Sequence, residues 1–210
     1  MNAGKFVNFT TEEMLALEKL ASEKYGVSTD QMMQNAGRAL HDFVAGELSE
    51  VRRVLVLAGK GNNGGDAMAA ADLLRESGYE VVAVRVEAPF EKSFDFSRFD
   101  LIIDGLFGFS LKGNPRPPID KIIEQINCSK VPVLAVDVPS GLEVFSGKIM
   151  KPIVKATYTL SLGMLKKGLR ENPDYAGKIC LGNLGIPSIA YAERGIAAPD
   201  FSEKNYVLIG

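Results

Sequence analysis

Residues 54–66 read VLVLAGKGNNGGD, a run of apolar residues that passes directly into a glycine-rich segment. An unbroken apolar run is typical of a strand covered on both faces, as in a parallel sheet. Glycines let the backbone turn tightly and approach a ligand without a clash at Cβ. The alanine-rich stretch 67–77 follows and predicts a helix. This order of strand, glycine turn and helix begins a βαβ unit.

Apolar runs and helix-like stretches continue to alternate along the chain. They predict strands at 81–86, 101–103 and 133–136, a helix at 119–126, and weaker strand patterns at 158–162, 179–181 and 206–209. Alternating strands and helices predict a parallel sheet with right-handed crossovers. In such sheets, ligands bind beyond the carboxyl ends of the strands.

Two helices are expected before the first strand. Thr10 and Glu13 have the spacing of a capping box, and Gly26 ends the helix that they begin. A second helix begins at Ser28 and continues to about residue 48, with apolar residues at helical spacing. Both helices therefore belong to the predicted fold.

The chain has 210 residues, of which 46% are hydrophobic. This length is enough for one domain with a full core and without disulfide or metal staples. We predict an α/β fold, a Rossmann-like three-layer αβα sandwich with a mostly parallel central sheet and two N-terminal helices. Residues 1–210 are expected to form one domain, with the helices of residues 1–50 packed on a core of residues 51–210.

Composition excludes several classes of protein. The 24 basic and 26 acidic residues are balanced, which argues against a large nucleic-acid or anionic-membrane surface. The single histidine, His41, excludes multi-histidine zinc sites. The two cysteines, Cys128 and Cys180, are too far apart for a CxxC pair and fit a reducing compartment. No transmembrane run and no signal peptide are recognised in the sequence.

The glycines of residues 59–64 satisfy the pattern G-x-G-x-x-G of nucleotide-binding βαβ units. Free amides and the dipole at a helix start favour a phosphate there. Glu87 falls near the end of the second strand, where a ribose-binding acid would lie. Asp66, however, places a carboxylate where a pyrophosphate would be repelled, so an ordinary dehydrogenase fits less well. Plain turn chemistry stays an alternative for Asn62 and Asn63.

Acids end two of the predicted buried strands. Asp104 ends one of them, and Asp137 ends the next and begins the motif Asp-Val-Pro-Ser-Gly. Aspartates at strand ends are frequently turn formers, but both would reach the same sheet edge as the glycine segment. Asn63, Asp104 and Ser140 together offer hard oxygen ligands, which suit a group 1 or group 2 cation and not zinc or copper.

Three lysines lie in loops near these acids. Lys112 lies in the loop after Asp104, and Lys166 and Lys167 follow the strand pattern at 158–162. Such lysines can meet a phosphate or an acid, but a solvated ammonium group is the more common outcome. From these residues alone we expect the three lysines to face solvent.

These motifs, in this order, resemble the YjeF N-terminal domain family, whose enzymatic members are NAD(P)H-hydrate epimerases. The matching blocks are Met32 to Gly37, Gly59 to Asp66, Asp104 to Gly113, Asp137 to Gly141, and Lys166. They span most of the chain, which is therefore expected to be a stand-alone YjeF N-terminal-like domain. Two departures occur: Gln34 stands where many members have Glu, and Phe109-Ser110 replaces a common Thr-Gly pair.

The resemblance implies a substrate, a reaction and a cofactor. The substrate would be NADH or NADPH hydroxylated at ring carbon 6, and the reaction the interconversion of its R and S forms for metabolite repair. One potassium ion per chain would be held by Asn63, Asp104 and Ser140. The substrate-binding residues would be Asn62, Asn63, Gly64, Gly65, Asp66, Gly108, Phe109, Ser110, Leu111, Lys112, Gly113, Asn114 and Asp137.

Epimerisation at carbon 6 needs an acid for the leaving hydroxyl and a base for the returning water. Because no histidine is available, Asp137 is the candidate for proton transfer. Lys166 is its candidate partner, either to tune that acid or to hold the substrate. Which group is the acid and which the base stays open at this point.

Two other functions match parts of the sequence. One is a non-catalytic scaffold or dimerisation module, like the related domain of decapping-enhancer proteins, and the other is a nucleotide-binding oxidoreductase. Arg85 and Glu87 favour opposite forms of the substrate, phosphorylated and unphosphorylated. The resemblance also implies a homodimer and a separate ATP- or ADP-dependent dehydratase as functional partner, with no nucleic-acid or membrane partner. We expect a cytoplasmic protein, or a mitochondrial one if a presequence was removed.

Overall fold

The structure, a computed structural model, describes residues 10–87, 90, 93–109, 111, 113–144 and 150–209. Its centre is a seven-stranded sheet with the order β2-β1-β3-β4-β5-β6-β7. The strands are β1 (Arg53–Ala58), β2 (Glu80–Arg85), β3 (Leu101–Gly105), β4 (Val133–Val136), β5 (Tyr158–Leu162), β6 (Lys178–Gly182) and β7 (Tyr206–Leu208). Every neighbouring pair is parallel except β6 and β7, which are antiparallel.

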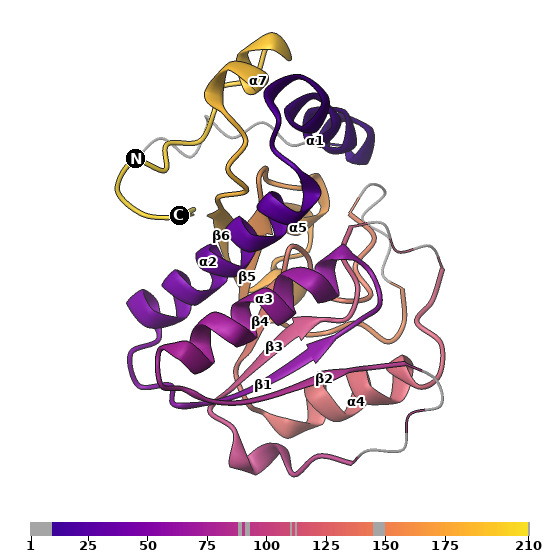
Figure 1. Cartoon of the computed structure of the whole chain (residues 1–210). Coiled ribbons are helices and arrows are strands. Elements are labelled where there is room, and N and C mark those ends of the chain that lie inside the picture. The colour runs from indigo at the N-terminus through magenta and orange to yellow at the C-terminus, as the bar shows by residue number, and fades with distance from the viewer. Residues whose placement is uncertain are drawn as a thin grey trace.

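Helices cover both faces of this sheet (Figure 1). They are α1 (Thr11–Tyr25), α2 (Thr29–Glu47), α3 (Asn62–Glu76), α4 (Ile119–Ser129), α5 (Lys167–Glu171), α6 (Pro173–Ala176) and α7 (Ser188–Glu193), with a 3-10 turn η2 (Phe96–Arg98). The predicted α/β sandwich with a mostly parallel sheet is confirmed, and all three weaker strand patterns form strands. None of the helices in the described ranges is long and apolar enough to cross a membrane.

Strand β1 contributes to the core on both sides of the sheet. Val54, Val56 and Ala58 belong to the cluster that includes α2 and α3. Leu55 and Leu57 belong to the cluster that includes α4. Successive side chains of a strand point to opposite faces, so a strand buried on both sides needs an unbroken apolar run.

The N-terminal helices begin at the predicted caps. Thr10 accepts from the amide of Glu13, whose carboxylate accepts from the amide of Thr10, and Ser28 and Gln31 repeat this arrangement for α2. Gly26 ends α1 in the left-handed conformation, with φ of 72°. Met14 and Leu17 of α1 belong to the same hydrophobic cluster as the sheet residues that face α2 and α3, so α1 packs on the core through its apolar side.

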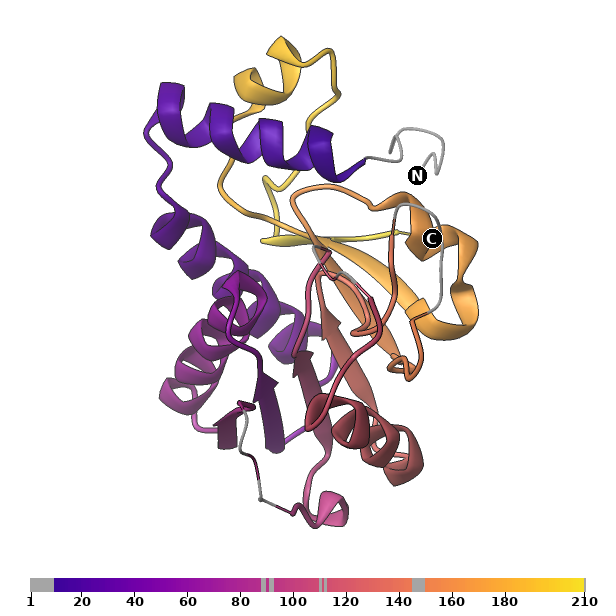
Figure 2. The ribbon, with the colours of Figure 1, turned by 90° about the vertical axis from the view of Figure 1, so that its right-hand side faces the viewer.

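The sheet order reverses direction at β1, since β2 lies on one side of it and β3 on the other. Ligands bind at such switch points, outside the carboxyl ends of the strands. Figures 1 and 2 show α1 beyond these strand ends, with α7 against it. The predicted site residues therefore belong to the edge of the sheet that faces α1.

Candidate functional site

A cavity of about 930 Å³ lies at the carboxyl ends of β1, β3 and β4. It is lined on one side by α1 and on the other by residues that follow the strands. Eight of the predicted substrate-binding residues line it: Asn62, Asn63, Asp66, Gly108, Phe109, Leu111, Asn114 and Asp137. Gly64, Gly65 and Gly113 do not line it, and Ser110 and Lys112 lie outside the described residues.

The glycine segment is the start of α3, whereas the sequence predicts a loop with a helix from residue 67. The helix begins at Asn62 because the amide of Gly65 already donates to the carbonyl of Gly61, at 3.1 Å. A Cβ at Gly64 would lie 2.0 Å from the carbonyl oxygen of Gly59. Gly64 therefore permits the close approach of strand end and helix start, which turns Asn62, Asn63 and Asp66 towards the cavity.

Asp137 and Lys166 form a buried ion pair in the cavity, with about 4% of each side chain exposed. Lys166 Nζ donates to Asp137 Oδ1, and it also donates to the carbonyl of Leu162 at 2.5 Å. The amide of Leu162 donates to the same Asp137 oxygen at 3.1 Å. Lys166 Nζ also lies over the ring of Phe109, 5.7 Å from the ring centroid. The expectation of a solvated Lys166 is wrong, because this carboxylate and carbonyl replace its water, while Lys167 remains exposed.

The backbone of Asp137 is in the left-handed region, with φ of 66°. This conformation costs a non-glycine residue roughly 1–2 kcal/mol. Such strain persists only where the surrounding structure enforces it, and it is concentrated at functional sites. Here the amide of Asp137 donates to Leu160 at 2.8 Å, and the turn directs the carboxylate back towards Lys166.

Asp104 and Ser140 are fully buried and do not line the cavity themselves. They lie beneath it, hydrogen-bonded to the amides of Leu106 and Phe107, which do line it. Asp104 accepts from the hydroxyl of Ser140 at 2.7 Å, from the Ser140 amide at 2.9 Å and from the Leu106 amide at 3.2 Å. Burial raises the pKa of the Asp104 carboxyl to about 6, although these hydrogen bonds lower it. Within the described residues, no lysine or arginine forms an ion pair with Asp104.

Asn63 adjoins this buried pair through the loop after β3. A Cβ added at Gly108 would lie 3.2 Å from the side chain of Asn63, and a Cβ added at Gly105 would lie 3.1 Å from its backbone carbonyl oxygen. The Ser140 hydroxyl accepts from the Phe107 amide of the same loop at 2.9 Å. The Nδ2 group of Asn63 is buried without a hydrogen-bond partner among the described residues. The structure thus brings the three predicted cation ligands to one loop.

Two further carboxylic acids face the cavity. Asp66 is buried, and its burial, followed by the charges of Asp137 and Glu18, raises its pKa well above the ordinary value. Glu18 is half-buried, and its burial raises its pKa, reinforced by Asp137 and opposed by Lys166. Lys166 is therefore the positive charge that interacts with three acids, Asp137, Asp66 and Glu18.

Helix α1 also contributes residues to the site, although no motif in the sequence marks them. Leu15, Glu18, Lys19, Ser22 and Glu23 line the cavity from this helix. Their spacing of three and four residues places them on one helix face. That face is mostly polar, so the sequence alone predicts that it faces solvent. Arg116, Pro117 and Pro118, which directly precede α4, also line the cavity.

Glu87 and Lys60 lie at the rim of the cavity and pair with each other, at 3.3 Å. Glu87 was expected where a ribose-binding acid would lie, and the structure places it on the lining of the cavity. Gln34, in contrast, is exposed and does not line the cavity. Its departure from the family pattern therefore changes no charge in the site.

His41 lies away from the cavity, in a hydrogen-bonded chain with Asp42 and Ser77, each 2.8 Å from a ring nitrogen. The arrangement has the order of a catalytic triad. An acyl-transfer site, however, also needs free amides for the oxyanion. The amides of Ser77, Gly78 and Tyr79 all donate to carbonyls of α3. These three hydrogen-bonded side chains therefore link α2 to the C-terminal end of α3.

The chain is similar to a described family and to several named proteins. The family model described as YjeF-related protein N-terminus matches residues 29–98 and 85–168. The chain is 34% identical to the NAD(P)H-hydrate epimerase of Plasmodium vivax, over 89% of this chain and 72% of that protein. It is 37% identical to the NAD(P)H-hydrate epimerase of Bordetella pertussis, over 87% of this chain and 90% of that protein.

A bifunctional NAD(P)H-hydrate repair enzyme of Hyperthermus butylicus is 36% identical over 79% of this chain, which spans 36% of that protein. Among solved structures, the crystal structure of yeast ynu0 superposes with a TM-score of 0.81 at 22% identity, and covers 96% of this chain and 99% of its own. At this identity the likeness shows a shared fold.

Proposed function

Because this chain belongs to the YjeF-related N-terminal family, we propose that it is an NAD(P)H-hydrate epimerase, an isomerase that interconverts the R and S forms of hydrated NADH or NADPH. The observation that carries this proposal is the meeting of Asp137 and Lys166 inside a cavity of about 930 Å³. Cavities of this size suit small-molecule ligands and cofactors. The intact cavity and acid motifs favour an enzyme over a scaffold.

The reaction requires the C–O bond at ring carbon 6 to break and to form again on the other face. The lone pair of the ring nitrogen forms a C=N bond as the hydroxyl leaves with a proton, as water. Water then attacks carbon 6, the C=N electrons return to nitrogen, and the attacking water loses a proton. No electrons are gained or lost overall, which distinguishes this reaction from that of an oxidoreductase.

Asp137 is the proton-transfer group proposed for these steps, and Lys166 is the partner that holds it. The carboxylate of Asp137 is held by Lys166 and by the Leu162 amide, so its position is fixed before the substrate enters. A fixed group within hydrogen-bond reach typically contributes ~10²–10⁴-fold through general acid–base catalysis. The ammonium group of Lys166 pairs with this carboxylate and so fixes its orientation in the cavity.

The residues beneath the cavity fit a potassium ion. Asp104, Ser140 and Asn63 carry hard oxygen ligands, which group 1 and group 2 cations prefer. Asp104 is a fully buried carboxylate whose pKa is raised by that burial, so a positive charge beside it would be stabilising. The described residues contain no group of three or more His, Cys, Asp or Glu side chains suited to a metal, and a single carboxylate matches a monovalent charge. When bound, the ion supplies a positive charge that offsets Asp104.

The substrate would occupy the space between α1 and the strand ends. Asn62, Asn63, Gly108, Phe109 and Asn114 would contact it, since all five line the cavity. At the rim, Lys60 neutralises Glu87. A neutralised acid neither repels a 2′-phosphate strongly nor is free to bind a 2′-hydroxyl, so we propose that both NADH-hydrate and NADPH-hydrate are accepted.

The biological setting of the enzyme follows from the chemistry. An epimerase restores only the balance of two epimers, so a separate ATP- or ADP-dependent dehydratase would complete the repair. One similar protein is named a bifunctional NAD(P)H-hydrate repair enzyme, in agreement with such a partnership. A homodimer and a cytoplasmic location are further parts of this proposal, to be tested by light scattering and by imaging of a tagged chain.

A coupled assay tests the proposed function. The protein is mixed with pure R-hydrate and a dehydratase specific for the S-hydrate, and recovery of NADH is followed by absorbance. We expect complete recovery, much faster than with the dehydratase alone. Unchanged recovery would contradict the proposal. The same protein with NAD and a panel of alcohols would reduce NAD only if it were an oxidoreductase.

A further inference from the structure

One face of α1 forms a wall of the cavity opposite the strand ends. Figures 1 and 2 show this helix beyond the carboxyl edge of the sheet. Leu15, Glu18, Lys19, Ser22 and Glu23 supply the wall. Asp137, Lys166 and Asp66 line the same cavity from the strand ends and from α3. A flat ring in this cavity would therefore have protein groups on both of its faces.

Glu18 is the half-buried acid of this wall, whereas Glu23 is exposed. The carboxyl group of Glu18 interacts electrostatically with both Lys166 and Asp137. Within the described part of the chain, neither a hydrogen bond nor an ion pair holds it. Glu23, in contrast, pairs with Lys19 on the same helix at 3.7 Å and is largely exposed. Glu18 therefore presents a free, half-buried carboxyl group to the interior of the cavity.

We propose that Glu18 is a second catalytic acid–base residue, and that it acts on the face of the nicotinamide ring opposite Asp137. This inference rests on the proposed epimerase function. An epimerase that exchanges a hydroxyl must assist departure on one face and return on the other. A single carboxylate on one side of the ring cannot reach both positions, so the reaction calls for groups on two walls.

The two steps balance with these two residues. In one direction, the protonated Glu18 donates its proton to the hydroxyl, and the C–O bond breaks as the ring nitrogen forms the C=N bond. Water then attacks carbon 6 from the opposite face, the C–O bond forms, and Asp137 accepts the proton. The reverse reaction uses the same groups with exchanged roles. Burial of Glu18 favours its protonated form, whereas the carboxylate of Asp137 is paired with the ammonium group of Lys166.

Asp66 is the alternative candidate, since it is buried, faces the cavity and has no hydrogen-bond partner among the described residues. It projects from the second turn of α3, however, close to the end of β1. Asp66 thus reaches the cavity from α3 and Asp137 from the end of β4, and among the three acids Glu18 alone comes from α1.

Oxygen-18 exchange separates the action of Glu18 from a structural role. Each hydrate is labelled at its C6 hydroxyl, and label loss and epimerisation are followed by mass spectrometry and chromatography for the wild type, Glu18→Gln and Glu12→Gln. Glu12 is exposed on the same helix and does not line the cavity. For Glu18→Gln we expect epimerisation about 10²-fold slower or more. The epimer whose hydroxyl faces Asp137 should still exchange its label at close to the wild-type rate.

The possible results are all informative. Wild-type epimerisation by Glu18→Gln, or an equal loss of exchange and epimerisation, would overturn the proposal. Failure of the wild-type protein to accelerate either process would instead contradict the epimerase function itself. If Glu18→Gln unfolds, Glu18→Asp serves in its place, since it keeps the carboxyl group one methylene further from the ring. That variant should lose more epimerisation than exchange, and an equal loss would again overturn the proposal.

Discussion

The ammonium group of Lys166 donates to the carboxylate of Asp137 in a site where about 4% of either side chain is exposed. Removing two charges from water is costly, and only good geometry and further hydrogen bonds compensate for it. The Leu162 carbonyl and amide supply those bonds. A buried pair of this kind is weak support for stability, and its place in the cavity indicates a role in proton transfer.

Removal of one partner of this pair should destabilise the protein strongly. Lys166→Met leaves Asp137 buried without a counter-charge, and we expect the free energy of unfolding to fall by about 3–5 kcal/mol. The double variant Lys166→Met/Asp137→Asn should recover a substantial part of that loss, because it removes both charges. Urea unfolding of the two variants measures the difference. Equal destabilisation of the single and double variants would show that the charges are not coupled.

The two helix-start glycines should differ in their tolerance of a side chain. A Cβ at Gly64 would lie 2.0 Å from the Gly59 carbonyl, whereas a Cβ at Gly61 would meet nothing within 4 Å. Gly64→Ser should therefore lower the stability by about 1–3 kcal/mol or prevent folding. Gly61→Ser is the matched control and should be neutral or slightly stabilising, since serine is a good N-cap. Thermal unfolding of both proteins checks this, and similar midpoints would refute the close packing.

Potassium should stabilise the protein through Asp104. A ligand that binds only the folded state raises the unfolding midpoint with concentration. We expect a higher midpoint in KCl than in choline chloride of the same ionic strength. Asp104→Asn should remove this difference, because it removes the one carboxylate of the proposed site. A potassium shift that persists in Asp104→Asn would place the ion elsewhere.

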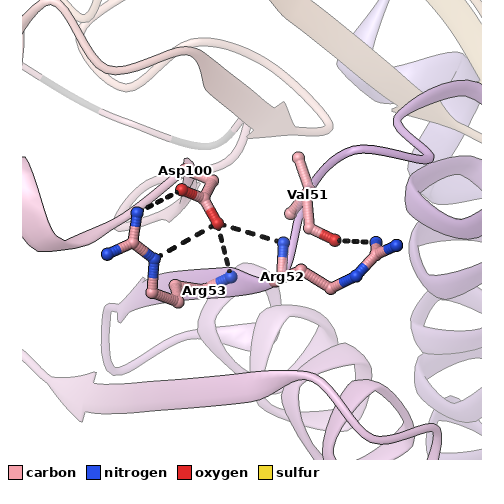
Figure 3. A network of polar contacts seen from close by, with 4 residues as sticks. All are labelled: Val51, Arg52, Arg53 and Asp100. Carbon is pink, nitrogen blue, oxygen red and sulfur yellow. Dashed lines mark hydrogen bonds and ion pairs between the residues drawn. The ribbon is translucent and has the colours of Figure 1, made fainter.

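The acid limb of the stability curve should depend on Asp100. Figure 3 shows its carboxylate between the side chain and amide of Arg53 and the amide of Arg52. The Arg53 side chain is the main cause that lowers the pKa of Asp100 to about 2. A lowered carboxyl pKa gives stability that is present above about pH 4 and is lost as the pH falls towards 2.

Because Asp100 is near the surface, solvent screening reduces this contribution to about 1 kcal/mol. Asp100→Asn should therefore be less stable at pH 7 and should lose less stability between pH 4 and pH 2 than the wild type. Asp72→Asn is the control, since Asp72 pairs with Arg75 on an exposed helix face. Urea midpoints at several pH values measure both. Parallel curves for the wild type and Asp100→Asn would contradict the assignment.

Much of the fold could be predicted because its signals are local. The apolar runs of β1, β3 and β4 and the capping residues Thr10 and Ser28 each determine a nearby element. The sheet edge then follows, since the carboxyl ends of parallel strands meet on one side. The sequence alone therefore predicts that this edge of the sheet brings together Asn63, Asp104 and Asp137.

The remaining parts of the site depend on contacts between distant segments. Glu18 lies on a polar helix face that is indistinguishable in sequence from a solvated face, and only the position of α1 over the strand ends brings it to the cavity. Lys166 is buried because it meets Asp137, 29 residues away. The early start of α3 at Asn62 requires the strand end at Gly59 to approach Gly64. None of these contacts has a local sequence signal.

The most direct test of this account is the rate of epimerisation by Asp137→Asn. The substitution keeps the size of the side chain and removes its ability to exchange a proton. Purified R-hydrate is incubated with each protein, and formation of the S form is followed by chromatography, with circular dichroism to establish that the variant is folded. We predict a rate ~10²–10⁴-fold below that of the wild type. A folded Asp137→Asn protein that equilibrates the two hydrates at the wild-type rate would contradict the account.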